Sequence, residues 1–424
     1  MQTRTRYILI GITFFFLLLT AVKSYRLTVN YGGGDLRTRV VGSRLLGTSH
    51  SPYFYKWHKG DGEFLLDPYN VPGRVVNGNV VTPATLYIIY PLAQLPYTNI
   101  KIIWNLLQFV AALVVLLLLL KRKNLPDNTL QWVILVSGII CSNIFLYNIE
   151  RCQMYIFYTL VFAIMYRCYL SAWKYSEFLS GFVGGLFILF RPFAGIMGLG
   201  FLLSRKIKWV YGCITGFVIG CILFVLPAPL LWQDYFRAMQ EYVSENTEHA
   251  HINMPAEAPV VLPAIIEGSS NITTVANFKL EWLNTLYWLL LPFGITITSS
   301  QSVILYVLLL IVMTWFFYKR KKFDPEMIFL FGFLAYMMAE QFILAPRAAY
   351  NVIQWLFPLV LISMRARNNL PLMVVLVTAL LLWHNFPFTF PFQGPMAEIL
   401  FFLLITFVVF FEKRKEQPLA EYSG

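Results

Sequence analysis

The most polar stretch of this apolar chain lies between residues 29 and 57 and reads VNYGGGDLRTRVVGSRLLGTSHSPYFYKW. Asp35 begins its charged part, and three arginines and a histidine follow: Arg37, Arg39, Arg44 and His50. A carboxylate can act as a general base that takes the proton from a hydroxyl group. The stretch therefore predicts a catalytic base, with arginines that either join the site or pair with nearby acids and lipid headgroups.

Asp35 also has a structural interpretation. Glycines at positions 32–34 precede it and free the backbone to turn. The apolar residues that follow have the spacing of a short helix lying on a membrane surface: Leu36, Val40, Val41 and Leu45. We expect Asp35 at the N-cap of this helix. A capping carboxylate can still act as a base, so the two interpretations do not exclude each other.

Polar side chains also interrupt later apolar segments. Arg191 stands before a proline within one segment, Asn148 and Gln153 lie at a turn between two others, and Arg347 follows another. A charged side chain inside a membrane segment costs about 2.5 to 3.5 kcal/mol on insertion scales. Arg191 and Arg347 therefore either bind an anion or reach lipid headgroups from a helix end. Asn148 and Gln153 either bind a ligand or join helices by hydrogen bonds.

The composition places these residues in a membrane protein. The 424 residues are 58% hydrophobic and 13% charged, whereas soluble domains are about 25% charged. Many apolar runs approach the roughly 20 residues that one helical crossing needs. The net charge of +12 is spread over short clusters between these runs. This is the positive-inside pattern of cytosolic loops, which favours membrane lipids as partners and argues against nucleic acid.

We expect an all-α polytopic protein in which residues 1–424 form a single integral-membrane domain with about ten to twelve transmembrane helices. The first crossing, residues 7–22, runs outward from a cytosolic N-terminus. Non-helical backbone at membrane depth must be buried or line a cavity. Residues 179–204, which turn at Arg191, are therefore expected to form two short helices or a re-entrant hairpin facing a polar site. The other predicted features are a first external loop (23–99) with a surface or re-entrant helix at 83–97, a second external loop (228–281), a short segment at 282–297, and a cytosolic tail (413–424).

The cysteines carry no metal-binding spacing. All five lie within or beside apolar runs: Cys141, Cys152, Cys168, Cys213 and Cys221. None belongs to a CxxC or Cys/His pattern, so the sequence predicts neither a zinc site nor a disulfide framework. No tight acidic cluster demands a divalent metal, and a metal-dependent reaction stays an open alternative. We expect no resident cofactor.

Several motifs occur in a distinctive order over residues 7–360. They are Asp35 after the first helix, Pro52-Tyr53 in SPYFYKW, the run TPATLYIIYPLAQLPY with a following IW, Asn148 and Gln153 at an outer turn, Arg191-Pro192 in a Gly-rich broken helix, and the late turn APRAAYN. This order resembles the GT-C class of integral-membrane glycosyltransferases. Within that class it resembles glycosyltransferase family 87, the polyprenyl-phosphate-mannose-dependent mannosyltransferase-like proteins. Cys152 stands where that family often has glycine before its glutamine, and the late turn lacks the family's common Ser-Pro and His pattern.

The resemblance implies a GT-C-like helical bundle that transfers mannose or another hexose from a polyprenyl-phosphate donor. The acceptor would be a glycolipid or glycan at the external face of the plasma (inner) membrane, with inversion at the anomeric carbon and no obligate protein partner. Both termini would be cytosolic. The implied roles are general base for Asp35, donor-phosphate binding for Arg191 and Arg347, and sugar or acceptor binding for Asn148, Gln153, Tyr53, Trp57, Arg37 and His50.

Three other functions stay open. A secondary transporter would explain the broken helix, because transporters build midplane sites from discontinuous helices. However, the breaks at 83–97, 191–192 and 282–297 show no two-fold correspondence, and the charges gather at one face. A polymerase or ligase of lipid-linked polysaccharide usually has its large loop late in the chain, whereas a major loop comes first here. A non-catalytic scaffold is the third alternative.

Overall fold

The computed structural model describes residues 3–30, 33–66, 79–120, 129–252, 299–320, 323–342, 349–366, 369–384 and 393–412. Arg347, the tail 413–424, the segment 282–297 and residues 253–281 of the second predicted loop lie outside these ranges. Within the described residues the chain is built from helices and contains no β-strand.

Four of the described helices are long and apolar enough to cross a membrane. They are α1 (Thr3–Asn30), α4 (Tyr97–Leu120), α10 (Ile207–Gly220) continued by η5 (Cys221–Val225), and α14 (Ser299–Lys319). A fifth span results if the chain from α5 (Thr129–Leu135) and η3 (Val136–Ile140) to α6 (Asn143–Glu150), bent by 51°, counts as one. The prediction of an all-α polytopic membrane protein is confirmed, and the number of crossings stays a prediction.

The remaining elements are shorter or less apolar. They are α2 (Gly34–Leu45), η1 (Glu63–Leu65), α3 (Pro83–Ala93), α7 (Tyr155–Tyr169), α8 (Ser176–Ile188), η4 (Pro192–Met197), α9 (Gly198–Leu203), α11 (Pro229–Ile252), α15 (Pro325–Phe342), η8 (Ala349–Trp355), α16 (Leu356–Ala366), α17 (Leu370–Leu381), α18 (Gln393–Thr406) and η9 (Phe407–Phe411). The helix α1 ends at Asn30 rather than at residue 22, so the stretch that leaves the first helix begins later than the sequence pattern indicated.

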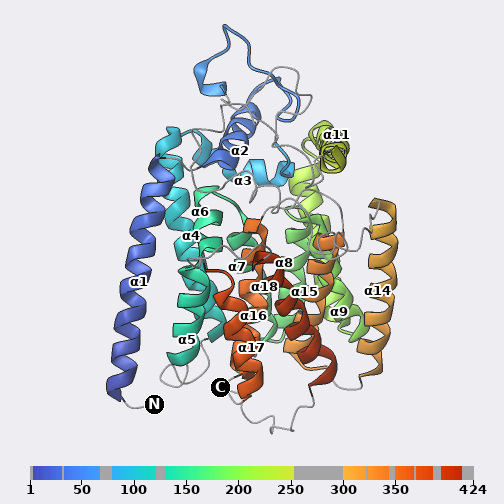
Figure 1. Ribbon diagram of the computed structural model, residues 1–424. Helices are drawn as coiled ribbons and strands as arrows, with labels where there is room; N and C mark the ends of the chain where they lie inside the picture. Colours follow the sequence, from blue (N-terminus) through green and yellow to red (C-terminus); the bar gives the residue numbers. More distant parts are fainter. Residues whose placement is uncertain are drawn as a thin grey trace.

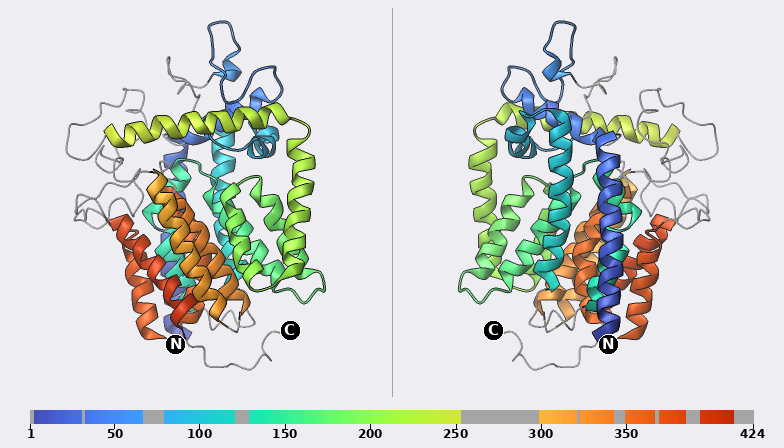
Figure 2. Two further views of the ribbon diagram at one scale, coloured as in Figure 1. Left: turned by 90° about the vertical axis from the view of Figure 1, so that its right-hand side faces the viewer. Right: turned by 90° about the vertical axis from the view of Figure 1, so that its left-hand side faces the viewer.

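Three helices, α2, α3 and α11, lie at one end of the bundle, and we call them the capping layer (Figure 1). Figure 2 shows α11 running across this end of the bundle. The layer is held by an apolar cluster in which Tyr53, Leu86 of α3, and Trp232 and Tyr235 of α11 are buried together. The hydroxyl of Ser43 joins α2 to α3 by donating to the carbonyl of Leu86 at 3.0 Å.

The broken helix predicted at residues 179–204 is confirmed as short pieces on either side of Arg191: α8 before it, and η4 and α9 after it. The helices α8 and α10 pack backbone to backbone, because a Cβ on Gly181 or Gly185 would overlap a backbone carbonyl of α10. Gly212 and Gly216 of α10 meet α8 in the same way. Small residues permit this close approach between membrane helices. Leu189, two residues before Arg191, joins the apolar cluster of the capping layer, so the break lies at that end of the bundle.

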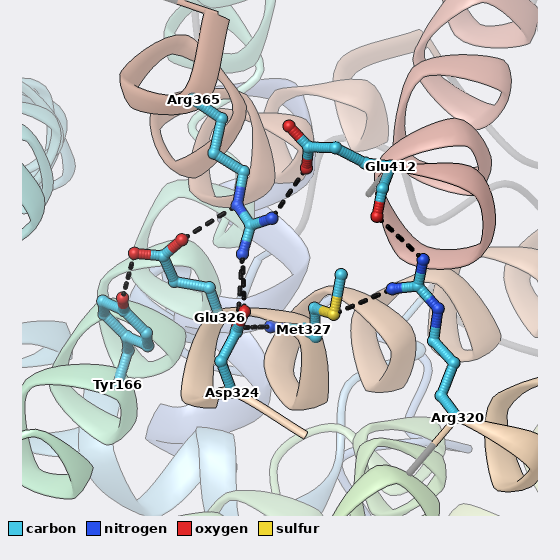
Figure 3. A network of polar contacts seen from close by, with 7 residues as sticks. All are labelled: Tyr166, Arg320, Asp324, Glu326, Met327, Arg365 and Glu412. Carbon is cyan, nitrogen blue, oxygen red and sulfur yellow. Dashed lines mark hydrogen bonds and ion pairs between the residues drawn. The ribbon is translucent and has the colours of Figure 1, made fainter. Parts of the chain in front are cut away.

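The opposite end of α15 carries a buried ionic network (Figure 3). Arg365 donates to Glu326 at 2.9 Å, to Glu412 at 2.8 Å and to both oxygens of Asp324 at 3.2 Å. Its side chain is only 8% exposed. The guanidinium ties the start of α15 to α16 and to the end of η9. Buried charges need such partners.

Candidate active site

Asp35 lies in the first turn of α2, where the chain leaves α1. Its side chain is half-buried, and Oδ2 accepts a hydrogen bond from Nε2 of Gln153. Oε1 of Gln153 accepts a hydrogen bond from Nη2 of Arg39 at 2.6 Å, and Nη1 of Arg39 donates to the carbonyl of Cys152 at 3.3 Å. Gln153 and Arg39 are both buried. One amide therefore fixes the orientation of Asp35 and is itself held by a buried guanidinium.

The corner before Asp35 is fixed by Gly33. Gly33, with φ +92°, is the N-cap of α2, and the carboxylate of Asp35 binds Gln153 rather than a backbone N–H of the helix. The Gly33 N–H donates to the Glu150 carbonyl at 2.7 Å, and the Tyr97 hydroxyl donates to the Gly33 carbonyl. A side chain here would be strained by the positive φ. The predicted N-cap position of Asp35 is therefore wrong, because a glycine with left-handed backbone begins the helix.

Gln153 is presented by the turn between α6 and α7. Cys152 adopts a left-handed conformation with φ +53° and is fully buried. The N–H of Gln153 donates to the Asn148 carbonyl at 3.0 Å, which closes the turn. Left-handed backbone favours glycine, which gives a physical reason for the glycine that the sequence resemblance leads us to expect at this position. In this chain a small buried thiol side chain occupies it instead.

Arg191 forms a second polar cluster with α15. Its Nη2 donates to both carboxylate oxygens of Glu340 at 2.5 Å, and its Nε donates to the Tyr336 hydroxyl at 3.3 Å. The Tyr336 hydroxyl donates onward to Oε1 of Gln354 at 2.6 Å. The side chain of Arg191 is 22% exposed and that of Glu340 only 5%. Arg191 is therefore an ion-paired group that keeps partial access to its surroundings, and not a helix-end cation extended toward headgroups.

The two clusters meet at the start of α7. The guanidinium of Arg191 lies over the rings of Tyr155 and Tyr158, at 5.5 and 5.9 Å from the ring centroids. Both tyrosines also lie within electrostatic range of Arg39. Tyr235 of α11 lies within the same range of Arg191. Asp35 and Arg191, predicted from segments far apart in the sequence, therefore belong to one polar region under the capping layer.

This region combines the groups that a transfer reaction from a phosphate leaving group requires. Asp35 has one oxygen, Oδ1, without a hydrogen-bond partner among the described residues, so it can accept a proton. Arg39 and Arg191 supply positive charge, and Asp35 and Glu340 balance it. Fixed cations in a partly buried site stabilise a departing anion more than the same cations in water.

Two of the residues predicted to bind sugar or acceptor, Asn148 and Tyr53, are fully buried. Nδ2 of Asn148 donates to Oε1 of Gln108 on α4 at 2.6 Å. This is the role of joining helices by a hydrogen bond that the sequence left open beside ligand binding. Tyr53 is also fully buried, and its hydroxyl donates to the Val81 carbonyl at 2.8 Å. Burial, with Tyr235 and Asp234 nearby, raises the pKa of Tyr53 well above its usual value. In this conformation neither side chain offers a surface to a sugar.

Trp57 and His50 lie beyond the far end of α2. Nε1 of Trp57 donates to the Gly62 carbonyl at 3.2 Å, and the exposed His50 ring packs 4.8 Å from the Tyr55 ring. Since α2 rises about 1.5 Å per residue, its two ends are roughly 16 Å apart. Arg37 is half-buried in the same turn of α2 as Asp35. Of these three, Arg37 is the one close to the predicted base.

Arg44 bonds to the backbone of α3 and of the loop before it. Its three guanidinium nitrogens donate to backbone carbonyls of Ala93 at 2.8 Å, Phe64 at 2.7 Å and Leu95 at 3.1 Å, and its guanidinium lies over the Phe64 ring. Burial lowers the pKa of Arg44 below its usual value. Arg44 therefore satisfies the carbonyls at the end of α3 and joins α2 to α3 within the capping layer.

Sequence reasoning missed Glu340 and Tyr336 and did not single out Arg39 from the other arginines of its stretch. Glu340 stands near the end of the long apolar run that finishes in MMAEQF, so the rule that singled out Arg191 also applies to it. Arg39 carried no such signal, because three arginines of the same stretch look alike. Within the described residues, no group of three or more His, Cys, Asp or Glu side chains is arranged to hold a metal ion.

Comparison with known proteins gives one family. The family model of glycosyltransferase family 87 matches residues 82–346, more than half of the chain. The matched range contains Gln153, Arg191 and Glu340 and begins after α1 and α2, which carry Asp35. Searches of curated proteins and of solved structures found no match. The match favours a glycosyltransferase over a transporter or a scaffold.

Proposed function

Because this chain belongs to glycosyltransferase family 87, we propose that it transfers a hexose, mannose in the simplest case, from a polyprenyl-phosphate donor to a hydroxyl group of a glycolipid or glycan. The observation that carries the proposal is the shared polar region under the capping layer: Arg191 and Arg39 both lie near Tyr155 and Tyr158, and Arg39 is joined to Asp35 through Gln153.

The reaction can be written on these residues. The acceptor hydroxyl gives its proton to Oδ1 of Asp35, and its oxygen forms a bond to the anomeric carbon of the sugar. The bond between that carbon and the phosphate oxygen breaks, and its electron pair leaves with the phosphate. Arg191 binds the phosphate, since a guanidinium can donate to two phosphate oxygens at once. Attack from the face opposite the leaving phosphate inverts the anomeric centre.

Gln153 is a positioning residue in this scheme. Its amide binds Oδ2 of Asp35 and is itself held by Arg39. This fixes the orientation of the carboxylate and therefore the direction of Oδ1. The prenyl chain would lie against apolar side chains beside the break at Arg191. Phe193, which is 39% exposed, is one of them. The capping layer would shield the reacting sugar from water, as it covers this end of the bundle (Figure 2).

The positions of basic residues suggest how the protein is oriented in the membrane. Arg4 and Arg6 begin α1, and Lys319 ends α14, at the end of the bundle away from the capping layer (Figures 1 and 2). Under the positive-inside rule this end is cytosolic and the capping layer is external. We propose a plasma (inner) membrane with the active site at its external face, with the lipid-linked donor as the source of the sugar and no resident metal assigned.

The test is transfer from a radiolabelled polyprenyl-phosphate mannose by the purified protein in lipid vesicles. Asp35→Asn should keep the thermal stability of the wild type and lose transfer, because the amide cannot take up the proton. Asp61→Asn, in the exposed loop after Trp57, is the matched control and should transfer at the wild-type rate. Arg191→Ala should raise the KM for the donor. Normal turnover by Asp35→Asn would remove Asp35 from the base role, and an unchanged donor KM would remove Arg191 from phosphate binding.

A further inference from the structure

Glu340 is a buried carboxylate that the reaction scheme does not use. It lies in the last turn of α15, and its side chain is 5% exposed. Both of its oxygens accept from Nη2 of Arg191 at 2.5 Å, and Arg191 is its one hydrogen-bond partner among the described residues. Glu340 is therefore devoted to the guanidinium that the proposed function assigns to the donor phosphate.

The contacts of Arg191 show what a phosphate would meet. Nε is held by Tyr336 and Nη2 by Glu340, while Nη1 has no hydrogen-bond partner among the described residues. A guanidinium offers two edges for a two-point grip: Nη1 with Nη2, and Nη2 with Nε. Both edges include Nη2. A phosphate can thus reach Nη1 singly, but a two-point grip requires that Glu340 release Nη2.

We propose that Glu340 is an internal competitor of the lipid phosphate: it neutralises Arg191 when the site is empty, is displaced from Nη2 by the donor phosphate, and returns to help release the product. The proposal rests on the assignment of Arg191 to phosphate binding. A mostly buried guanidinium without an anion is disfavoured. Glu340 and the phosphate are the two anions that can satisfy it in turn.

The charges of donor and product give the exchange a direction. A polyprenyl-phosphate sugar is a phosphodiester with one negative charge. Transfer leaves a phosphomonoester, whose second ionisation near pH 6 gives it close to two charges at neutral pH. Arg191 alone would hold this product more tightly than the donor. A carboxylate that competes for Nη2 weakens the binding of both and favours the departure of the product.

The experiment measures binding of farnesyl phosphate, a soluble lipid phosphomonoester, to the purified full-length protein in detergent. Glu340→Gln keeps the shape of the side chain and removes its charge. It should bind farnesyl phosphate about tenfold more tightly than the wild type, a size usual for coupled binding events. In transfer assays the donor KM and the inhibition constant of farnesyl phosphate should both fall. Glu398→Gln is the matched control. Its carboxylate is also buried but accepts from Trp355, and its affinity should stay at the wild-type value.

Two further variants separate the possible outcomes. Glu340→Asp shortens the carboxylate away from Nη2 and should change the affinity in the same direction by a smaller factor. The double variant Arg191→Ala/Glu340→Gln should lose the gain. Equal or weaker binding by folded Glu340→Gln, or by folded Glu340→Asp where the glutamine variant does not fold, would show that Glu340 only supports Arg191 structurally. If the wild type and Arg191→Ala bind equally, phosphate binding by Arg191 is wrong, and this inference fails with it.

Discussion

Replacing Gln153 by leucine tests whether this residue positions Asp35 or binds a sugar. The substitution roughly conserves side-chain volume and removes both hydrogen bonds of the amide, the one donated to Asp35 and the one accepted from Arg39. The backbone turn is kept, because the N–H of Gln153 bonds to the Asn148 carbonyl in either case. Asp35 would then be free to rotate about its side-chain bonds.

The magnitude follows from the two bonds lost. A hydrogen bond to a charged group contributes about 1.5 to 3 kcal/mol. If the bond to Asp35 contributes this amount in the transition state, kcat should fall about 10- to 150-fold. The bond to Arg39 mainly affects folding, and its loss should cost a similar free energy of unfolding, since among the described residues Arg39 keeps only the Cys152 carbonyl as a partner.

The assay is steady-state transfer from polyprenyl-phosphate mannose, with kcat and the KM values of donor and acceptor measured separately. Gln108→Leu is the control. It makes the same substitution at a fully buried site on α4 and removes one bond, to Asn148 at 2.6 Å. It should lower the unfolding temperature but keep kcat per folded molecule. Gln153→Leu should lower kcat and leave the donor KM unchanged.

Two results would refute the positioning role. A rise in the KM of donor or acceptor at constant kcat would assign Gln153 to sugar binding, as the sequence resemblance implied. An equal fall in kcat for Gln153→Leu and Gln108→Leu would mean that packing of the bundle, and not the orientation of Asp35, limits the reaction.

Two other predictions concern parts of the molecule outside the proposed site. Arg365→Met should lower the free energy of unfolding by about 3 to 5 kcal/mol, because Glu326 would stay buried without its guanidinium. Thermal unfolding in detergent measures this, and an unchanged midpoint would contradict the role of the network. Hydrogen bonds from Tyr55 and from the His58 N–H lower the pKa of Asp61. The loop they hold should therefore keep this stabilisation above about pH 4 and lose it as the pH falls further. Hydrogen exchange of residues 55–65 at pH 5 and pH 3, corrected for the intrinsic rate, should show the loss in the wild type and a smaller loss in Tyr55→Phe, which keeps the bond from the His58 N–H.

Local signals predicted the parts of the fold that depend on local chemistry. The glycines before Asp35 and the Arg191-Pro192 pair each break a helix by backbone sterics, and both breaks are present. The exact cap was not predictable, because the choice between Gly33 and Asp35 depends on Tyr97 and Glu150, which arrive from other helices. Boundaries of apolar helices were also underestimated, since polar residues near a membrane exit can continue a helix.

The pairings within the candidate site could not be predicted. Which arginine of α2 meets Gln153 depends on the angle at which α2 leaves α1, and that angle has no pattern in one sequence. The pairing of Arg191 with Glu340 joins residues 149 positions apart. An isolated acid in an apolar helix predicts that a partner exists, but only the packed structure identifies it.

The glycine contact between α8 and α10 has a consequence for how this enzyme could be altered. Two helices whose backbones touch cannot slide or tilt without breaking van der Waals contact along their shared length. Arg191 lies just beyond the end of α8, so its backbone is attached to a rigid pair of helices. The helices α3 and α11 of the capping layer do not take part in this glycine contact, so side chains there can be exchanged without moving Arg191. Engineering of this protein should therefore begin in the capping layer and leave the glycines of α8 and α10 unchanged.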